Sequence, residues 1–147
     1  MQRPITSHQK KLSALCAIVG AESSSKELEK IEVSGIAQAS DSVLAGDLFI
    51  ALPGEKFHGA QFASDAVSRG AVAVLTDAKG AKDIKGVPVL ISNNPRRAAG
   101  IASAWFYSEP MRDLYSVGVT GTNGKTTVTT LLHQIMTAAG RDSGLIG

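Results

Sequence analysis

Apolar residues recur along this chain at two spacings, and the spacing separates the expected helices from the expected strands. One helix face is marked by four apolar residues, Leu12, Leu15, Cys16 and Val19. Gly20 follows them as a stop signal. Asn94 and Pro95 are typical of a helix start, because asparagine caps the first turn and proline is tolerated in it. The spacing predicts four helices, over residues 12–19, 60–69, 95–107 and 126–139.

Short apolar runs between these helices predict strands over residues 31–36, 48–52, 71–75, 87–91 and 114–119. Pro88 places the strand 87–91 at an edge of the sheet, since proline cannot donate a hydrogen bond to a neighbour. Residues 21–30 are polar and predict a surface loop, and residues 145–147 begin a further strand. Strands that alternate with helices through short loops predict an α/β fold with a mostly parallel sheet.

Composition and charge narrow the classes of partner. With 44% hydrophobic and 19% charged residues among 147, the chain can bury a core. A net charge of +2 is too balanced for a basic nucleic-acid surface, so we expect no nucleic-acid partner. No run approaches the roughly 20 apolar residues of a membrane helix, so we expect no membrane span. Because Cys16 has no second cysteine to pair with, we predict a cytoplasmic protein.

The strongest chemical signal is a glycine-rich loop, T-G-T-N-G-K-T-T, over residues 120–127. Between a strand and a helix, such a loop turns backbone N–H groups inward and binds phosphate. We expect Lys125 to reach the β- and γ-phosphates and the Thr126 hydroxyl to ligate Mg²⁺. Asn123 and Gly124 are residue types that tolerate the left-handed turn this loop needs. The sequence therefore predicts a nucleoside triphosphate site.

The loop departs from the usual spacing in one respect. The pattern G-x-x-x-x-G-K-[ST] would place its first glycine at position 119, where this chain has Val119. The alternative interpretation is a glycine-rich turn with one surface lysine, but an expected strand and helix flank the loop as phosphate binding requires. The motif alone does not identify the reaction, because kinases, ligases, motors and switches share it.

Residues 108–110, Ser-Glu-Pro, end the third helix and indicate a domain boundary. We expect one domain over residues 1–110 and the beginning of a second over residues 111–147. A complete triphosphate site also needs an acidic metal ligand from another strand. Asp142 is too close to the loop helix to supply it, so we expect the chain to be part of a longer enzyme.

Residues 117–127 resemble the ATP loop of the Mur ligases, cytoplasmic enzymes that add amino acids to the peptidoglycan precursor. Further stretches resemble the same family, at residues 46–54, 70–74, 106–110 and 144–147. The resemblance is weakest over residues 1–30. It implies a small N-terminal α/β domain that binds a UDP-linked substrate, followed by the start of a P-loop, Rossmann-like ATPase domain.

The resemblance assigns the glycine-rich loop to ATP, with Mg²⁺ as cofactor. Lys125 is then the catalytic residue that stabilises charge on the transferring phosphoryl group, and Thr126 positions the metal. The implied ATP-binding residues are Gly121, Thr122, Asn123, Gly124, Lys125, Thr126 and Thr127.

For the UDP-linked substrate the resemblance implies two contact segments. Ser40 matches the serine that contacts the nucleotide in the family, although Asp41 stands where arginine is usual. The second segment is the loop that carries Glu55, Lys56 and Phe57. We interpret His58, which follows that loop, as a structural histidine and not as a ligand of the nucleotide.

The implied activity is ATP-dependent amide formation through an acyl phosphate. A diamino acid, meso-diaminopimelate or L-lysine, is added to UDP-N-acetylmuramoyl-L-alanyl-D-glutamate, and these two substrates are the expected partners of a monomeric enzyme. The sequence leaves the choice of diamino acid open, and we expect the 147 residues to be inactive alone. Two alternatives stay open: the sister ligase that adds the terminal D-Ala-D-Ala dipeptide, and a nucleotide-binding module without catalysis.

Overall fold

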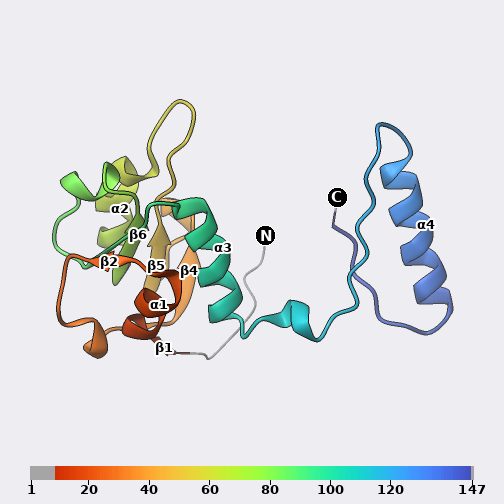
Figure 1. Cartoon of the computed structure of the whole chain (residues 1–147), viewed down its shortest axis with the longest axis horizontal. Helices are drawn as coiled ribbons and strands as arrows, with labels where there is room; N and C mark the ends of the chain where they lie inside the picture. Colours follow the sequence, from red (N-terminus) through yellow and green to blue (C-terminus); the bar gives the residue numbers. More distant parts are fainter. Residues whose placement is uncertain (1–8, 147) are drawn as a thin grey trace. The chain divides into compact units, whose positions relative to one another are not determined.

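The computed structural model describes residues 9–146, and the contacts within the chain divide it into two compact units. One unit runs to Pro110 and the other begins at Met111. The first unit contains a sheet with helices packed on it, whereas the second contains one long helix (Figure 1). No helix within residues 9–146 is long and apolar enough to cross a membrane.

A five-stranded sheet forms the centre of the first unit, in the order β2-β7-β6-β5-β4. Its four parallel strands are β4 (Gly35–Ala37), β5 (Asp47–Ile50), β6 (Ala73–Thr76) and β7 (Val89–Ile91). The short β2 (Glu22–Ser23) pairs with β7 in the antiparallel direction. A separate antiparallel pair joins β1 (Lys10–Lys11) to β3 (Glu32–Val33), so the predicted strand 31–36 is divided between β3 and β4.

Helices cover both faces of this sheet. The helices α1 (Leu12–Val19) and α3 (Pro95–Phe106) pack on one face, and α2 (Ala63–Ser68) packs on the other. Successive side chains of a strand point to opposite faces. Leu48 and Ile50 of β5 therefore join the cluster with α1 and α3, while Phe49 joins the cluster with α2. This arrangement confirms the predicted α/β fold with a mostly parallel sheet.

The predicted ends of two helices have the expected geometry. Gly20 follows α1 in the left-handed conformation, with φ of 60°, and its N–H donates to the carbonyl of Ala17 at 3.3 Å. Asn94 caps α3, because its side-chain oxygen accepts a hydrogen bond from the N–H of Arg97 at 3.1 Å. Both ends follow from local residue chemistry.

The prediction that the strand 87–91 lies at an edge is wrong. β7 lies between β6 and β2, and β2 forms the edge. Pro88 is tolerated because it precedes β7 and contributes only its carbonyl, which accepts a hydrogen bond from the N–H of Val74 at 3.0 Å. The prediction of a plain loop over residues 21–30 missed β2 as well, since a two-residue strand leaves no periodic pattern.

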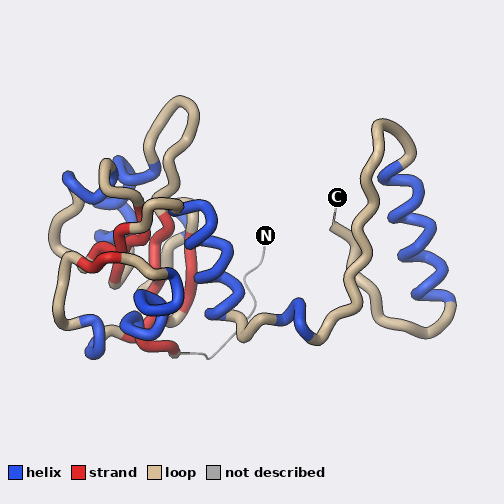
Figure 2. Tube along the Cα trace, viewed as in Figure 1, coloured by secondary structure: helices blue, strands red, loops and turns tan. Residues whose placement is uncertain are grey.

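The predicted strands over residues 114–119 and 145–147 are not formed within the described residues (Figure 2). Residue 147 lies outside that part of the chain. A strand is defined by hydrogen bonds to a neighbouring strand, and residues 111–146 hold no paired extended segments. Their apolar side chains are exposed accordingly, among them Leu114, Tyr115 and Val117.

Several turns are 3₁₀-helical. The helix expected over residues 60–69 begins as such a turn, η3 (Gly59–Phe62), and becomes α-helical only in α2. The helix after the glycine-rich loop is α4 (Lys125–Ala138). The remaining 3₁₀ turns are η1 (Leu28–Lys30), η2 (Ser40–Ser42), η4 (Gly80–Asp83) and η5 (Pro110–Arg112).

Candidate functional site

The backbone of the glycine-rich loop is bent by two glycines before α4 begins. Gly121 has a φ of 149° and Gly124 a φ of 77°, conformations that residues with a side chain rarely adopt. Gly124 is the N-cap of α4, and its carbonyl accepts a hydrogen bond from the N–H of Val128 at 2.9 Å. The first N–H groups of a helix have no partner within the helix, so this end of α4 suits an anion.

Of the two residues that tolerate a left-handed turn, Gly124 adopts it and Asn123 does not. Among the described residues other than glycine, positive φ angles occur at Ser108 and Glu109, and Asn123 is not one of them. The glycines on either side take the bends of the loop instead. Asn123 can thus keep an ordinary backbone conformation.

Lys125 folds back over the loop that precedes it. Its Nζ donates to the carbonyl of Gly121 at 2.6 Å and to the carbonyl of Thr122 at 3.4 Å. The fold therefore brings the ammonium group and the glycine turns together at the exposed N-terminal end of α4. A fixed cation beside a helix N-terminus is an arrangement that favours a bound phosphate.

The residues present also fit the predicted metal. Thr126 and Thr127 are exposed on the first turn of α4. A hydroxyl oxygen is a hard ligand, and Mg²⁺ prefers such ligands together with phosphate oxygens and water. Within residues 9–146 no cluster of three or more acidic, histidine or cysteine side chains could hold a metal by itself. Thr126 would contribute one hydroxyl ligand to this metal, beside the phosphates.

The residues predicted for the UDP-linked substrate follow the ends of two neighbouring strands. β4 and β5 are parallel, so their carboxyl ends lie at the same edge of the sheet. This edge is where open α/β sheets bind ligands. Ser40 begins η2 after β4, and Phe57 is 67% exposed on the loop after β5. Glu55 and Lys56 are exposed on the same loop.

Ser40 interacts with α2. Its hydroxyl hydrogen-bonds the carboxylate of Asp65 and holds the pKa of that carboxyl below its usual value. Arg69 lowers the pKa of Asp65 further, through an ion pair at 3.1 Å. Asp41, which stands where the family has arginine, is exposed. Asp65 thus links Ser40 to the cation Arg69.

A contact between His58 and Asp77 was not predicted from the sequence. His58 Nε2 lies 3.1 Å from Asp77 Oδ1, and the N–H of Ala60 donates to His58 Nδ1 at 3.0 Å. His58 thus caps η3, which supports its interpretation as a structural residue. The N–H of Gly80 donates to Asp77 Oδ1 at 2.7 Å. An aspartate directly after a buried strand, with glycine three residues later, is the turn signal that could have revealed Asp77.

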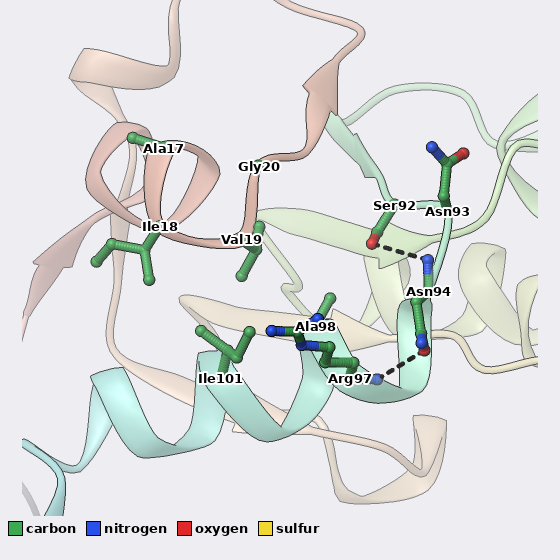
Figure 3. A pocket seen from close by; sticks show the side chains of 10 residues that line it. All are labelled: Ala17, Ile18, Val19, Gly20, Ser92, Asn93, Asn94, Arg97, Ala98 and Ile101. Carbon is green, nitrogen blue, oxygen red and sulfur yellow. Dashed lines mark hydrogen bonds between the residues drawn. The ribbon is translucent and has the colours of Figure 1, made fainter.

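A pocket of about 400 Å³ lies between the C-terminal end of α1 and the first turns of α3 (Figure 3). The N–H of Asn94 donates to Ser92 Oγ at 3.2 Å on its polar side. Ile18, Val19 and Ile101 line its apolar side. The residues predicted to bind ATP or the UDP-linked substrate are not part of its lining.

Comparison with known families agrees with this fold. The sequence profile of the Mur ligase family, catalytic domain, matches residues 32–109, which is more than half of the chain. The chain belongs to the Mur ligase family. The matched region lies within the first unit and includes β5, β6 and β7 of the sheet. The family resemblance of the sequence is thereby confirmed.

One curated relative is the UDP-N-acetylmuramoyl-L-alanyl-D-glutamate--2,6-diaminopimelate ligase of Streptomyces avermitilis. It is 43% identical to this Mur ligase chain over 138 residues, which are 92% of the chain and 26% of the relative. The chain spans about a quarter of the length of the curated relatives it matches.

Two solved structures have a similar fold. MurF from Acinetobacter baumannii has a TM-score of 0.71 at 23% identity, over 89% of this chain and 28% of that chain. A UDP-N-acetylmuramoyl-L-alanyl-D-glutamate--2,6-diaminopimelate ligase has a TM-score of 0.69 at 21% identity, over 95% of this chain and 28% of that chain. The two scores are nearly equal, so the fold does not distinguish these two ligases.

Proposed function

We propose that this Mur ligase chain provides the UDP-substrate domain and the ATP loop of a ligase that adds diaminopimelate to UDP-N-acetylmuramoyl-L-alanyl-D-glutamate. The observation that carries the proposal is the 43% identity, over 92% of the chain, to a protein named for that reaction. The arrangement of Lys125 over the glycine turns supports the ATP part. Diaminopimelate is chosen over L-lysine because the relative's name specifies it.

In the first unit, the carboxyl edge of the sheet would bind the UDP-linked substrate. The Ser40 hydroxyl, the Lys56 ammonium and the exposed Phe57 ring offer a hydrogen-bonding group, a cation and an apolar face. A nucleoside diphosphate needs all three, since its base has apolar faces and its diphosphate is anionic. We assign this site to residues up to about 110, with Ser40, Glu55, Lys56 and Phe57 as contacts.

In the second unit, the glycine-rich loop would bind ATP, which supplies the phosphoryl group that activates a substrate carboxylate. Gly121 and Gly124 shape the loop so that backbone N–H groups face the phosphates. Lys125 would neutralise charge on the transferring group, and Thr126 would hold Mg²⁺. Thr122, Asn123 and Thr127 complete the proposed contacts. We propose further that the enzyme is monomeric and acts in the cytoplasm, where ATP is available.

The sister ligase that adds D-Ala-D-Ala is the second candidate. The TM-scores of 0.71 to MurF and 0.69 to a diaminopimelate ligase are nearly equal, so the fold leaves this candidate open. The two ligases differ in the peptide on the UDP-linked sugar, which is a dipeptide for the first and a tripeptide for the second. Affinity for these two forms therefore discriminates between them.

The test is a set of three calorimetric titrations of the purified chain. We expect saturable binding of UDP-N-acetylmuramoyl-L-alanyl-D-glutamate, weaker binding of UDP-N-acetylglucosamine, and separate binding of ATP with Mg²⁺. Lys56→Ala should lower the affinity for UDP-N-acetylmuramoyl-L-alanyl-D-glutamate by about tenfold, because an interaction with a phosphate is lost. Lys85→Ala removes another exposed lysine of the same unit and serves as the matched control. A folded chain that binds ATP but neither UDP compound contradicts the proposal and favours a plain nucleotide-binding module.

Turnover can be measured in a chimera in which these residues replace the matching quarter of the Streptomyces avermitilis ligase. We expect ADP release that depends on both the UDP-linked dipeptide and diaminopimelate. A chimera that instead requires the tripeptide form and D-Ala-D-Ala would overturn the assignment in favour of the sister ligase.

A further inference from the structure

Two loops meet at the carboxyl edge of the sheet. β5 and β6 are parallel neighbours, with Ile50 opposite Leu75, so the segments that follow them leave the sheet side by side. The segment after β5 leads to His58, and the segment after β6 begins at Asp77. The side chains of His58 and Asp77, 3.1 Å apart, are only 19% and 26% exposed. A largely desolvated hydrogen bond therefore joins the two loops.

Both ring nitrogens of His58 have a defined partner. The N–H of Ala60 donates to Nδ1, so Nδ1 carries no proton and Nε2 carries the proton donated to Asp77. The same carboxylate oxygen accepts the N–H of Gly80. A side-chain carbon on Gly80 would lie 2.5 Å from His58 Cε1, so the ring packs directly against this glycine. The ring is thus held in one orientation.

The loop between Leu52 and His58 is closed at its base. Pro53 and His58 form an isolated antiparallel bridge, and the N–H of Gly59 donates to the carbonyl of Leu52 at 2.8 Å. Arg96 of α3 donates from Nη2 to the carbonyl of Pro53 at 2.9 Å. The residues at the tip of the loop are exposed: Glu55, Lys56 and Phe57.

We infer that His58 and Asp77 are positioning residues of the UDP-substrate site, and that their hydrogen bond holds the tip of this loop in the orientation that meets the nucleotide. The inference rests on the proposed function. Neither side chain touches the substrate in this role, since both act through the loop. A loop that is ordered before binding loses less conformational freedom when the ligand arrives, so the affinity for the substrate depends on the pair.

Three substitutions separate this role from simple support of the fold. His58→Asn keeps an oxygen that can cap η3 through the N–H of Ala60, but its side chain is too short to reach Asp77. Asp77→Ala removes the acceptor. Asp77→Asn keeps an oxygen in the same place and is the conservative rescue. Asp83→Asn, at an exposed position of η4, is the matched control.

The measurement is calorimetric titration of each variant chain with UDP-N-acetylmuramoyl-L-alanyl-D-glutamate and, separately, with ATP and Mg²⁺. We expect Kd for the UDP compound to rise about tenfold in His58→Asn and Asp77→Ala, and by less than about threefold in Asp77→Asn. His58→Asn and Asp77→Ala remove the same hydrogen bond. Kd for the UDP compound should therefore also rise about tenfold in the double variant, and not about a hundredfold. Kd for ATP should not change.

Unchanged affinity for the UDP compound in His58→Asn and Asp77→Ala overturns the inference while the proposed function stands. If Asp77→Ala does not fold, the affinity of His58→Asn for the UDP compound decides whether the inference holds. A folded wild-type chain that binds no UDP compound overturns the proposed function and this inference together. The nitrogen NMR shifts of the His58 ring report on the geometry without any ligand: the proton is expected on Nε2, and a ring with its proton on Nδ1 overturns the inference.

Discussion

The buried carboxylate of Asp47 accepts a hydrogen bond from the backbone N–H of Leu44 at 2.7 Å and so closes the turn that leads into β5. Asp47 is only 1% exposed. Beside it, Gly46 has a φ of 88°, and a side-chain carbon there would lie 2.2 Å from Ser34 Oγ. Gly46 and Asp47 begin a stretch that resembles the Mur ligases. In that stretch, these two residues build the turn before a central strand.

Asp47→Ala is expected to lower the free energy of unfolding by about 1.5–3 kcal/mol, because a hydrogen bond to a charged acceptor is lost. Asp47→Asn keeps an acceptor oxygen and should lower the free energy of unfolding by less. Asp41→Ala, at an exposed position, is the control and should stay within about 0.5 kcal/mol of the wild type. Urea unfolding followed by circular dichroism measures the difference. An Asp47→Ala transition that overlays the wild-type curve would contradict the structural role.

Gly124→Ala is expected to weaken ATP binding about five- to thirtyfold. The added carbon meets nothing within 4 Å, so the effect arises from the φ of 77°, which is unfavourable by about 1–2 kcal/mol for a residue with a side chain. Gly118→Ala is the matched control, since its added carbon also meets nothing within 4 Å and its backbone is not in the left-handed region. Titration with ATP and Mg²⁺ compares the two. Equal affinities in both variants would show that the bend at Gly124 does not matter for ATP.

Lys125→Ala is expected to weaken ATP binding by about ten- to a hundredfold, because the ammonium group that would contact the phosphates is removed. In the chimeric ligase the same change should abolish turnover. Binding of the UDP compound should not change, since that site is proposed in the other unit. Arg141→Ala removes an exposed cation of the same unit and is the control. An equal loss of affinity for both ligands would mean that the two sites are not in separate units.

The stability of the first unit should depend on pH through Asp77. The N–H of Gly80, followed by His58, holds the pKa of Asp77 below its ordinary value of 3.8. The folded state therefore binds this proton less readily than the unfolded state. The stabilisation from the ionised Asp77 carboxylate is fully present above the pKa of the unfolded state. It is lost as the pH falls through the lower pKa of the folded state.

Urea unfolding of the wild type from about pH 6 to about pH 2 should show this loss, and Asp77→Asn should show a shallower dependence. Asp83→Asn serves again as the control in the same turn. Parallel pH profiles for the wild type and Asp77→Asn would contradict the assignment of the pH dependence to this carboxylate.

The sequence by itself determined the parts of this Mur ligase whose information is local. The apolar stripe that ends at Gly20 marked α1, and the cap at Asn94 marked the start of α3. Both signals are local, since helical periodicity and capping involve neighbouring residues. The apolar runs around Phe49 and Val74 marked β5 and β6, because strands covered on both faces are apolar throughout. The glycine-rich loop was found in the same way, from a few consecutive residues before α4.

Only the tertiary structure decided which distant segments meet. Pro88 predicted an edge strand, yet β2 pairs with β7 and forms the edge instead. Strand pairing depends on where a segment far away in the sequence returns to the sheet. The hydrogen bond of Arg96 to Pro53 joins residues 43 positions apart. His58 and Asp77 meet because two parallel strands end at one edge. No periodicity along the chain encodes such contacts, since they arise from the packing of whole elements.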